Sequence, residues 1–415
     1  MARTYWVETL GCPKNEVDSD KLVGTLVADG LVAASSPDEA DVVVVNTCAF
    51  IEVARQESVD TILALDGARR PGSELIVTGC LAERYGSEIS DAIPTVDRVA
   101  GFGVPVTLGR KAAEGAVPSL DLLNLPRPKS PRPWAYVKIA EGCDRSCGFC
   151  AIPSFRGKQR SRTPDDILRE VDDLGVEEIV LVAQDLASYG KDVQGMGAGS
   201  IVPLVRAVAS RVRRTRLLYL YPSDLSDELI DVVGCESGVP YFDLSLQHVS
   251  KPLLRRMRRW GDGARFLARV EDIRRRFPEA AFRSNFIVGY PGETEDDHDE
   301  LLRFVEEARM EWVSFFSYSR EEGTFAAGLE GTVDEGLVKE RLLELTALQD
   351  EITAERRRAL VGRRIEVLVD APGVGRSHRE APEIDGVVEI PESLAAGSFA
   401  DVVVTGAFGP DLEAA

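Results

Sequence analysis

The sequence lacks any long hydrophobic run, and nowhere do about 18 consecutive apolar residues occur, the shortest stretch expected of a membrane-spanning helix. The first ten residues, Met1–Leu10, also lack the basic start and apolar centre of a secretory signal peptide. These absences argue against an integral membrane protein and against export. We therefore expect a cytoplasmic protein with no membrane partner.

Cysteine and histidine are scarce, with seven cysteines and three histidines in 415 residues. A small, odd number of cysteines argues against a disulfide scaffold. Six of the seven fall into two spaced sets of three, which is typical of metal ligation in a reducing compartment. The seventh, Cys235, stands alone, and we interpret it as a small loop residue.

Positive charge is in deficit: 49 lysines and arginines face 69 aspartates and glutamates, which gives a net charge of −20. Such a charge repels phosphate backbones unless a local basic patch overrides it, so a basic protein partner fits better than naked RNA. The length of 415 residues indicates two or three globular domains.

The most specific feature present is the CxxxCxxC motif of Cys143, Cys147 and Cys150. Three thiolates hold only three irons of a cubane 4Fe-4S cluster, so the fourth iron stays open to bind a small molecule. A structural zinc is the alternative, and it would need a fourth ligand from Asp144, a distant histidine or Cys235. The motif resembles the signature of radical S-adenosylmethionine (SAM) enzymes, which implies reductive cleavage of SAM and hydrogen-atom abstraction.

Residues 1–115 alternate strand and helix patterns, which predicts an α/β domain with a mostly parallel sheet. Short buried strands are expected at Tyr5–Val7, Asp41–Val45 and Leu75–Val77, with helical stretches at Glu16–Ala28, Phe50–Leu65 and Leu81–Tyr85.

Cys12, Cys48 and Cys80 each follow one of these three strands. Because the carboxyl ends of parallel strands lie along one edge, the three thiols can converge there as a second metal site. The alternative is three buried cysteines that merely end strands.

A proline-rich linker is expected at 116–133, followed by a second domain at 134–356. Six strand candidates alternate with helical patterns there: Trp134–Ile139, Glu178–Ala183, Arg216–Tyr221, Tyr241–Leu246, Ala281–Gly289 and Trp312–Tyr318. This alternation predicts a partial (β/α)6 barrel with its chemistry at the carboxyl ends of the strands, and the CxxxCxxC motif follows the first strand. A long charged helix at 333–358 is expected to close the barrel.

Residues 357–415 no longer alternate strand and helix patterns. Short strands are expected there among glycine and proline, at 364–369, 385–390 and 401–405. They predict a small antiparallel β-barrel.

Two three-cysteine sites on separate α/β modules, followed by a small β-barrel, resemble the methylthiotransferases over essentially the whole chain. That family carries an N-terminal methylthiotransferase domain, a radical SAM domain and a C-terminal TRAM domain. The resemblance implies two 4Fe-4S clusters and SAM as cofactors. It implies that Cys143, Cys147 and Cys150 hold the SAM cluster, and that Cys12, Cys48 and Cys80 hold an auxiliary cluster whose open iron carries the sulfur to be inserted.

The resemblance also implies SAM contacts at the ends of the barrel strands, and the candidates are Gln184, Asp185, Tyr219, Tyr221, Gln247, His248, Gly289 and Glu293. Simpler interpretations stay open, because 289–293 is a turn by composition, His248 can be a core histidine and the glutamines can cap strand ends. Arg156 can bind a carboxylate or a phosphate, although an exposed arginine is the commoner outcome.

Two local motifs, Gly-Cys-Pro-Lys-Asn at 11–15 and Cys-Gly-Phe-Cys-Ala-Ile-Pro-Ser at 147–154, resemble the branch that modifies an aspartate of ribosomal protein S-twelve. Enzymes of the branch that modifies transfer RNA more often show Cys-Gln-Met-Asn at the first cysteine. From 359 to 415, four basic and ten acidic residues give a net charge of −6, which suits a basic ribosomal protein better than tRNA.

The implied partners are ribosomal protein S-twelve, free or in the small subunit, and an electron donor such as flavodoxin or ferredoxin. Arginine runs at 255–259 and 274–276 favour RNA instead, unless they form a solvated helix face. Two alternatives stay open: a tRNA methylthiotransferase acting at N6-modified adenosine, and a non-catalytic iron–sulfur carrier.

Overall fold

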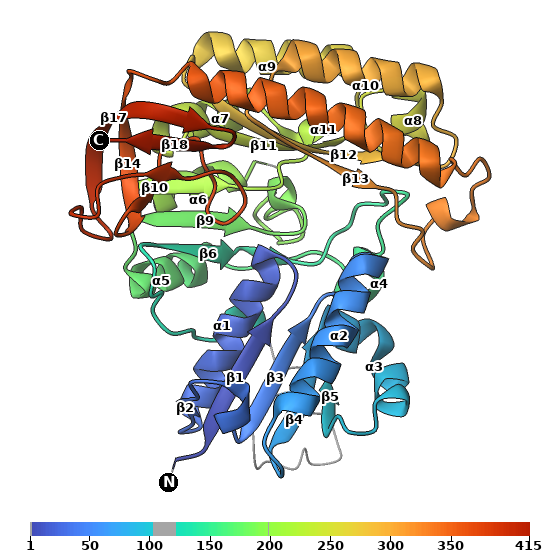
Figure 1. Ribbon diagram of the computed structural model, residues 1–415, viewed down its shortest axis with the longest axis vertical. Coiled ribbons are helices and arrows are strands. Elements are labelled where there is room, and N and C mark those ends of the chain that lie inside the picture. The colour runs from blue at the N-terminus through green and yellow to red at the C-terminus, as the bar shows by residue number, and fades with distance from the viewer. Residues whose placement is uncertain (1, 103–121, 198) are drawn as a thin grey trace. The chain divides into compact units, whose positions relative to one another are not determined.

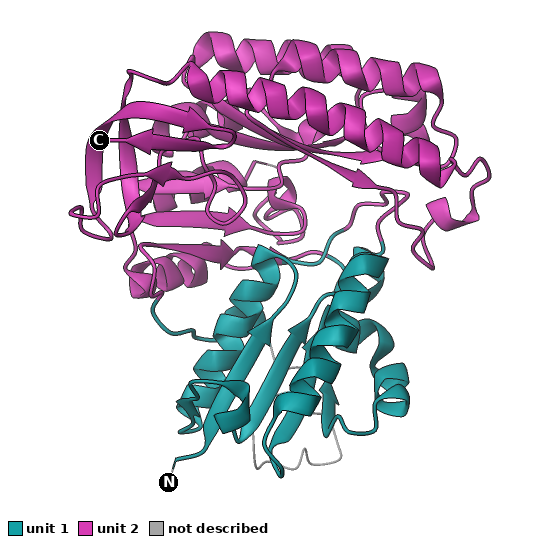
Figure 2. Cartoon of the chain, viewed as in Figure 1, with its two compact units in different colours: residues 1–129, 141–143, 151–158 teal, residues 130–140, 144–150, 159–415 magenta. Residues whose placement is uncertain are grey.

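The computed structural model describes residues 2–102, 122–197 and 199–415. Residues 1–129, 141–143 and 151–158 form one compact unit, and residues 130–140, 144–150 and 159–415 form a second (Figure 2). The start of the expected linker, 116–121, lies outside the described residues, and the domain boundaries inferred from the sequence stay predictions.

The first unit is built on a five-stranded parallel sheet with the order β2-β1-β3-β4-β5. Its strands are β1 (Thr4–Thr9), β2 (Val32–Ala33), β3 (Val42–Thr47), β4 (Glu74–Gly79) and β5 (Arg98–Ala100). The three strands expected from the sequence form the centre of this sheet. The edge strands β2 and β5 have only two and three residues, too few to show a pattern in the sequence.

Helices cover both faces of this sheet (Figure 1). They are α1 (Pro13–Ala28), α2 (Glu52–Ala68), α3 (Cys80–Ala92) and α4 (Ile152–Arg156), with short 3-10 turns η1 (Pro37–Glu39) and η2 (Leu122–Asn124). Successive residues of a strand point to opposite faces. Val44 therefore packs with Leu22 of α1, whereas Val45 packs with Ile62 of α2 and Leu81 of α3. The result is a three-layer unit, and the α/β domain with a parallel sheet that the sequence predicts is confirmed.

The second unit contains six parallel strands in two sheets of three, β6-β9-β10 and β11-β12-β13. Their bounds are β6 (Trp134–Lys138), β9 (Glu178–Val182), β10 (Arg214–Leu217), β11 (Tyr241–Gln247), β12 (Ala281–Val288) and β13 (Trp312–Ser317). A single bridge between Leu220 and Leu244 joins the two sheets. Because the strands follow one another in sequence order, they form the expected partial barrel, with β10 beginning two residues earlier than predicted.

Seven helices described in this unit accompany the strands: α5 (Pro164–Leu174), α6 (Ile201–Ala209), α7 (Asp227–Asp231), α8 (Lys251–Arg256), α9 (Gly263–Arg276), α10 (Glu295–Ala308) and α11 (Glu335–Arg358). Short turns lie between them: η3 (Leu186–Ser188), η4 (Pro222–Asp224), the π-helical η5 (Val232–Glu236) and η6 (Ala326–Gly328). The long helix α11 packs against β13 and buries Leu345 and Ile352. Within the described ranges, no helix has both the length and the apolar character needed to cross a membrane.

The C-terminal segment forms a closed barrel with the strand order β14-β15-β16-β18-β17. Its strands are β14 (Arg364–Ala371), β15 (Val374–Arg376), β16 (Val388–Glu389), β17 (Phe399–Phe408) and β18 (Asp411–Ala414). All pairs are antiparallel except β16 with β18, which is parallel. Val367, Val404 and Leu412 are buried in its core.

Buried polar contacts join this C-terminal barrel to the amino-terminal ends of the (β/α) strands. Glu178, the first residue of β9, pairs with Arg216 of β10 at 2.8 Å and with Arg376 of β15 at 3.0 Å. The indole Nε1 of Trp312, the first residue of β13, donates to the carbonyl of Arg379 at 2.7 Å. The C-terminal barrel therefore occupies the end of the (β/α) barrel opposite to the carboxyl ends of its strands.

Candidate functional site

Cys12, Cys48 and Cys80 lie where β1, β3 and β4 end, at one edge of the first unit's sheet. Cys12 immediately precedes α1, and Cys80 is the first residue of α3. A Cβ added to Gly11 would lie 3.0 Å from the Cys48 Sγ, so the loop that carries Cys12 lies directly against Cys48. The thiols are close enough that charge on Cys12 raises the pKa of both others. The convergence expected from the sequence is present.

The three thiols have different proton affinities. Burial raises the pKa of Cys48 to about 12 and also raises that of Cys80. Burial acts in the same direction on Cys12, but the charges of Lys14 and Arg156 and backbone N–H donors at the start of α1 outweigh it, and its pKa is lowered. Metals bind cysteine as the thiolate, so binding of a metal by these three side chains would be coupled to loss of their protons.

The structure does not arrange these thiols as the ligands of a single metal ion. In the described part of the chain, no three His, Cys, Asp or Glu side chains are arranged to hold a metal ion. A cubane cluster distributes its ligands around four iron atoms and accepts a wider separation of thiolates than zinc does. A second iron–sulfur cluster on Cys12, Cys48 and Cys80 therefore stays a prediction.

Arg156 at the end of α4 lies against this cysteine set. Its Nη2 donates to the Cys80 Sγ at 3.1 Å and to the Asn15 Oδ1 at 2.6 Å, while Nη1 pairs with Asp18 at 3.1 Å and Glu141 at 3.0 Å. Its side chain is 3% exposed. Burial lowers the pKa of this guanidinium, but the neighbouring anions outweigh burial and raise it well above its ordinary value. Arg156 binds carboxylates, as one interpretation of the sequence had it, and the expectation of an exposed arginine was wrong.

Two polar side chains that the sequence did not single out hold the cysteine loops in place. The Asn15 Nδ2 donates to the carbonyls of Leu10 at 2.8 Å and Thr47 at 3.0 Å. The Ser58 Oγ accepts from the Cys48 N–H and donates to the Cys48 carbonyl, both at 3.0 Å. In the sequence Asn15 is only the last residue of the motif at 11–15, and its position three residues after Cys12 is the signal that could have identified it.

The loop with the second cysteine set follows β6 and lies between the short strands β7 (Ala140–Glu141) and β8 (Arg160–Ser161) in sequence. Cys143 belongs to the first unit, and Cys147 and Cys150 belong to the second. Gly142 has a φ of +78°, and a Cβ there would lie 2.2 Å from the Lys158 carbonyl, so this position requires glycine.

Cys147 has an arginine partner of its own. The Arg259 Nη1 donates to the Cys147 Sγ at 3.3 Å, and its guanidinium lies 4.2 Å from the centre of the Tyr221 ring. The interpretation of the 255–259 run as a solvated face was therefore wrong for Arg259. Arg145, inside the CxxxCxxC motif, stacks on the same ring at 3.8 Å and pairs with Asp185 at 2.5 Å.

The candidate SAM contacts lie at or just beyond the carboxyl ends of the strands. Gln184 and Asp185 follow β9, Tyr219 and Tyr221 follow β10, Gln247 ends β11 with His248 after it, and Gly289 and Glu293 follow β12. Tyr219 and Gln247 have φ values of +66° and +71°, a strained conformation for a side-chain-bearing residue that is most frequent at functional sites. Asp185 and Tyr221 are brought together through Arg145.

His248 and Glu293 already have internal partners. The His248 ring is fully buried, its Nδ1 accepts from the Ser250 N–H at 3.1 Å, and burial lowers its pKa to about 4. Glu293 accepts from the Gly289 and Tyr290 N–H groups and pairs with Arg341 at 2.9 Å. These contacts favour supporting roles, and a role in SAM binding stays a prediction for both.

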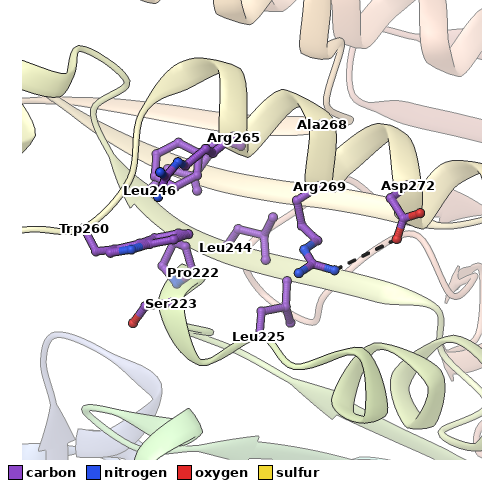
Figure 3. Close-up of a pocket in the computed structure, with 11 residues that line it drawn as sticks. Pro222, Ser223, Leu225, Leu244, Leu246, Trp260, Arg265, Ala268, Arg269 and Asp272 are labelled. Carbon is purple, nitrogen blue, oxygen red and sulfur yellow. Dashed lines mark ion pairs between the residues drawn. The ribbon is translucent and has the colours of Figure 1, made fainter.

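Two cavities flank the strand ends. One of about 440 Å³ opens beside the seam between the two sheets and is lined by Leu244, Leu246 and Trp260, with Arg269 reaching in from α9 (Figure 3). Arg269 is neutralised there, because it pairs with Asp227 at 2.6 Å and with Asp272 at 4.0 Å. The second, of about 400 Å³, lies between the ends of β12 and β13 and α11, and Gly289 is the one candidate SAM contact among the described residues lining it.

Three family models match successive parts of the chain. Residues 4–101 match the uncharacterized protein family UPF0004, residues 137–305 the radical SAM superfamily, and residues 361–415 the TRAM domain. The matches agree with the α/β unit, the partial barrel and the small closed barrel.

Curated relatives match nearly the whole length. The chain is 43% identical to ribosomal protein uS12 methylthiotransferase RimO of Moorella thermoacetica, with 96% of each chain covered. It is 42% identical to the protein of that name from an Anaeromyxobacter species, covering 99% of this chain and 93% of the relative. The Streptomyces coelicolor protein is 40% identical, with 100% and 96% covered. The resemblance to methylthiotransferases is confirmed.

Proposed function

Because the chain belongs to the family of ribosomal protein uS12 methylthiotransferases named RimO, we propose that it inserts a methylthio group at the β-carbon of an aspartate of that ribosomal protein. One SAM serves as the methyl donor and a second as the radical source. The observation that carries the proposal is the presence of two separate cysteine triplets on a chain with full-length similarity to this family.

Each cysteine set has a distinct role in this proposal. Cys143, Cys147 and Cys150 hold a 4Fe-4S cluster that supplies reductive cleavage of SAM, and Cys12, Cys48 and Cys80 hold a second cluster that supplies the sulfur. The protein binds SAM at the strand ends through the candidate contacts, and Tyr221, fixed between Arg145 and Arg259, is the aromatic surface beside Cys147. An electron donor such as flavodoxin or ferredoxin delivers the reducing electron.

The C-terminal barrel supports a basic protein substrate. Part of its negative charge is not available to a partner, because the side chains of Glu380 and Asp385 are buried and form ion pairs with buried arginines. Glu389, Glu392, Asp401 and Glu413 remain exposed on the barrel strands and loops. Glu389 and Glu413 are direct neighbours across β16 and β18. Two like charges in register destabilise a sheet, and a basic partner would relieve their repulsion. Modification of a ribosomal protein also fits the expected cytoplasmic location.

The test is an anaerobic reaction of the reconstituted protein with SAM, dithionite and sulfide. Ribosomal protein uS12 and N6-modified tRNA are offered separately, and mass is read on each. We expect uS12 to gain the mass of a methylthio group less one hydrogen, at a single aspartate. A variant with Cys143, Cys147 and Cys150 all changed to alanine is the control and should leave both substrates and SAM unchanged.

The alternatives predict different results. A gain on tRNA alone would replace the protein substrate with RNA. No gain on either substrate, with SAM uncleaved and iron released to an acceptor protein, would indicate an iron–sulfur carrier.

A further inference from the structure

One buried side chain of the first unit contacts both a cysteine of one set and a residue that lies two positions before a cysteine of the other set. Arg156 touches the Cys80 Sγ through Nη2 and both carboxylate oxygens of Glu141 through Nη1. Glu141 lies two residues before Cys143, with only Gly142 between them. A continuous chain of contacts therefore runs from Cys80 through the guanidinium of Arg156 to the backbone that carries Cys143.

Other groups of the first unit surround the Arg156 guanidinium. The guanidinium lies 4.3 Å from the centre of the Phe102 ring, and Asp18 pairs with it from α1. Asp18 and Glu141 are 1% and 11% exposed, so both carboxylates are largely shielded from solvent. Because the charges are buried, they act on the neighbouring thiolate with little screening.

A cation that donates a hydrogen bond to a sulfur ligand changes the reduction potential of the cluster. Reduction adds negative charge to a cluster, and a nearby positive charge favours the reduced form. A nearby carboxylate does the reverse. Arg156 and its two partner carboxylates, Asp18 and Glu141, therefore act in opposite directions on the Cys80 site.

We propose that Arg156 is a positioning residue that holds the Cys80 thiolate and raises the reduction potential of the cluster on Cys12, Cys48 and Cys80, while its partner Glu141 lowers that potential. This inference rests on the proposed function, because it requires the second cluster. It adds a role for residues outside both cysteine triplets.

The test measures the second cluster alone in the full-length protein. The background variant carries Cys143→Ala, Cys147→Ala and Cys150→Ala, so that only the other three cysteines can hold iron. After anaerobic reconstitution, iron content and the midpoint potential are measured by a mediated dithionite titration followed by electron paramagnetic resonance. The substitutions tested in this background are Arg156→Gln, Arg156→Lys and Glu141→Gln.

The expected shifts have opposite signs. Arg156→Gln should shift the midpoint potential to a more negative value, Arg156→Lys should shift it less, and Glu141→Gln should shift it to a more positive value. Arg69→Gln is the matched control. Arg69 is a partly buried arginine of the same unit that pairs with Asp66 and Asp97 and contacts no cysteine, so its loss should leave the potential unchanged.

The outcomes distinguish the absence of a second cluster from the absence of an effect of Arg156 and Glu141 on its potential. No iron in the background variant would overturn the second cluster and this inference together. Iron with an unchanged potential in all three substitutions, or shifts of one sign in both Arg156→Gln and Glu141→Gln, would overturn the inference and leave the second cluster standing. If Arg156→Gln fails to hold a cluster, the midpoint potentials of Arg156→Lys and Glu141→Gln still show whether the two shifts have opposite signs.

Discussion

Substituting Arg357 by methionine should loosen the attachment of the C-terminal barrel to the radical SAM barrel. Arg357 on α11 forms an ion pair with Glu380, in the segment between β15 and β16, and the two side chains are 1% and 0% exposed. The second Glu380 oxygen accepts from the Ser377 N–H at 2.7 Å and from its hydroxyl at 2.6 Å. Methionine keeps much of the aliphatic length but leaves the Glu380 carboxylate buried without a counter-charge.

The size of the effect follows from the pKa of Glu380. Burial raises it, but Arg357 and the Ser377 hydrogen bonds outweigh burial and lower it from 4.5 to about 2. A shift of this size corresponds to about 3 kcal/mol in favour of the folded state at neutral pH. Removing one partner of a buried pair typically costs ~3–5 kcal/mol. We therefore expect Arg357→Met to lower the free energy of unfolding by about 3 kcal/mol at pH 7.

The assay is urea unfolding followed by tryptophan fluorescence. Trp312 reports this junction, because the Arg357 guanidinium lies 5.2 Å from the centre of its ring. The loss should also depend on pH. In the unsubstituted protein the contribution of Glu380 is complete above pH 4.5 and disappears as pH falls towards 2. In Arg357→Met, burial raises the pKa of Glu380, so acid protonates it and the difference between the two proteins shrinks.

Two variants serve as controls. Arg358→Met removes the neighbouring exposed arginine of the same helix and should change the free energy of unfolding by about 0.5 kcal/mol or less. The double variant Arg357→Met with Glu380→Gln removes the unpaired charge and should recover at least half of the loss. A loss in Arg357→Met no larger than in Arg358→Met, or one that stays constant from pH 8 to pH 4, would refute the reasoning.

Three further predictions concern the first unit, the barrel core and the C-terminal surface. Gly79→Ala should cost roughly 1–3 kcal/mol and reduce iron bound beside Cys80, because Gly79 has a φ of +91° and a Cβ would lie 2.4 Å from the Asn46 Oδ1. Gly72→Ala, with a φ of +83° but open space around it, isolates the backbone strain, and equal iron losses in both would contradict the steric argument. Since burial lowers the pKa of His248 to about 4, stability should fall as pH drops from 6.5 towards 4, and His248→Asn should remove that slope in urea unfolding at stepped pH. Changing Glu389 and Glu413 together to glutamine should slow association with uS12 and weaken its salt dependence in stopped-flow measurements, and an unchanged rate would exclude the barrel surface from the encounter.

Much of the fold follows from local patterns in the sequence. Runs such as Val42–Val45 are buried on both faces, so their hydrophobicity is continuous and marks a parallel strand without any knowledge of its neighbours. The two-residue strand β2 has no such pattern, and it pairs with β1 only because the chain returns to that edge. The parallel pairing of β16 with β18 likewise depends on how the C-terminal barrel closes.

The same division holds for the candidate site. The spacing of the six cysteines placed each of them after a strand, and the topology of parallel sheets was enough to predict that Cys12, Cys48 and Cys80 meet. The partners of those cysteines were not predictable, because Arg156 reaches Asp18 across 138 residues and Arg259 reaches Cys147 across 112. An arginine in a charged helix has the same local pattern whether it faces solvent or a thiolate.

The sequence by itself determined the class of chemistry, since ligand type and spacing are properties of a short segment, and it determined the order of the three domains, since strand and helix periodicities are local. Only the tertiary structure decided which arginines are buried, which carboxylates neutralise them, and that Arg156 links Cys80 to the loop of Cys143. The physical reason is that a buried charge is stable only with its partners, and those partners come from wherever the fold brings the chain back.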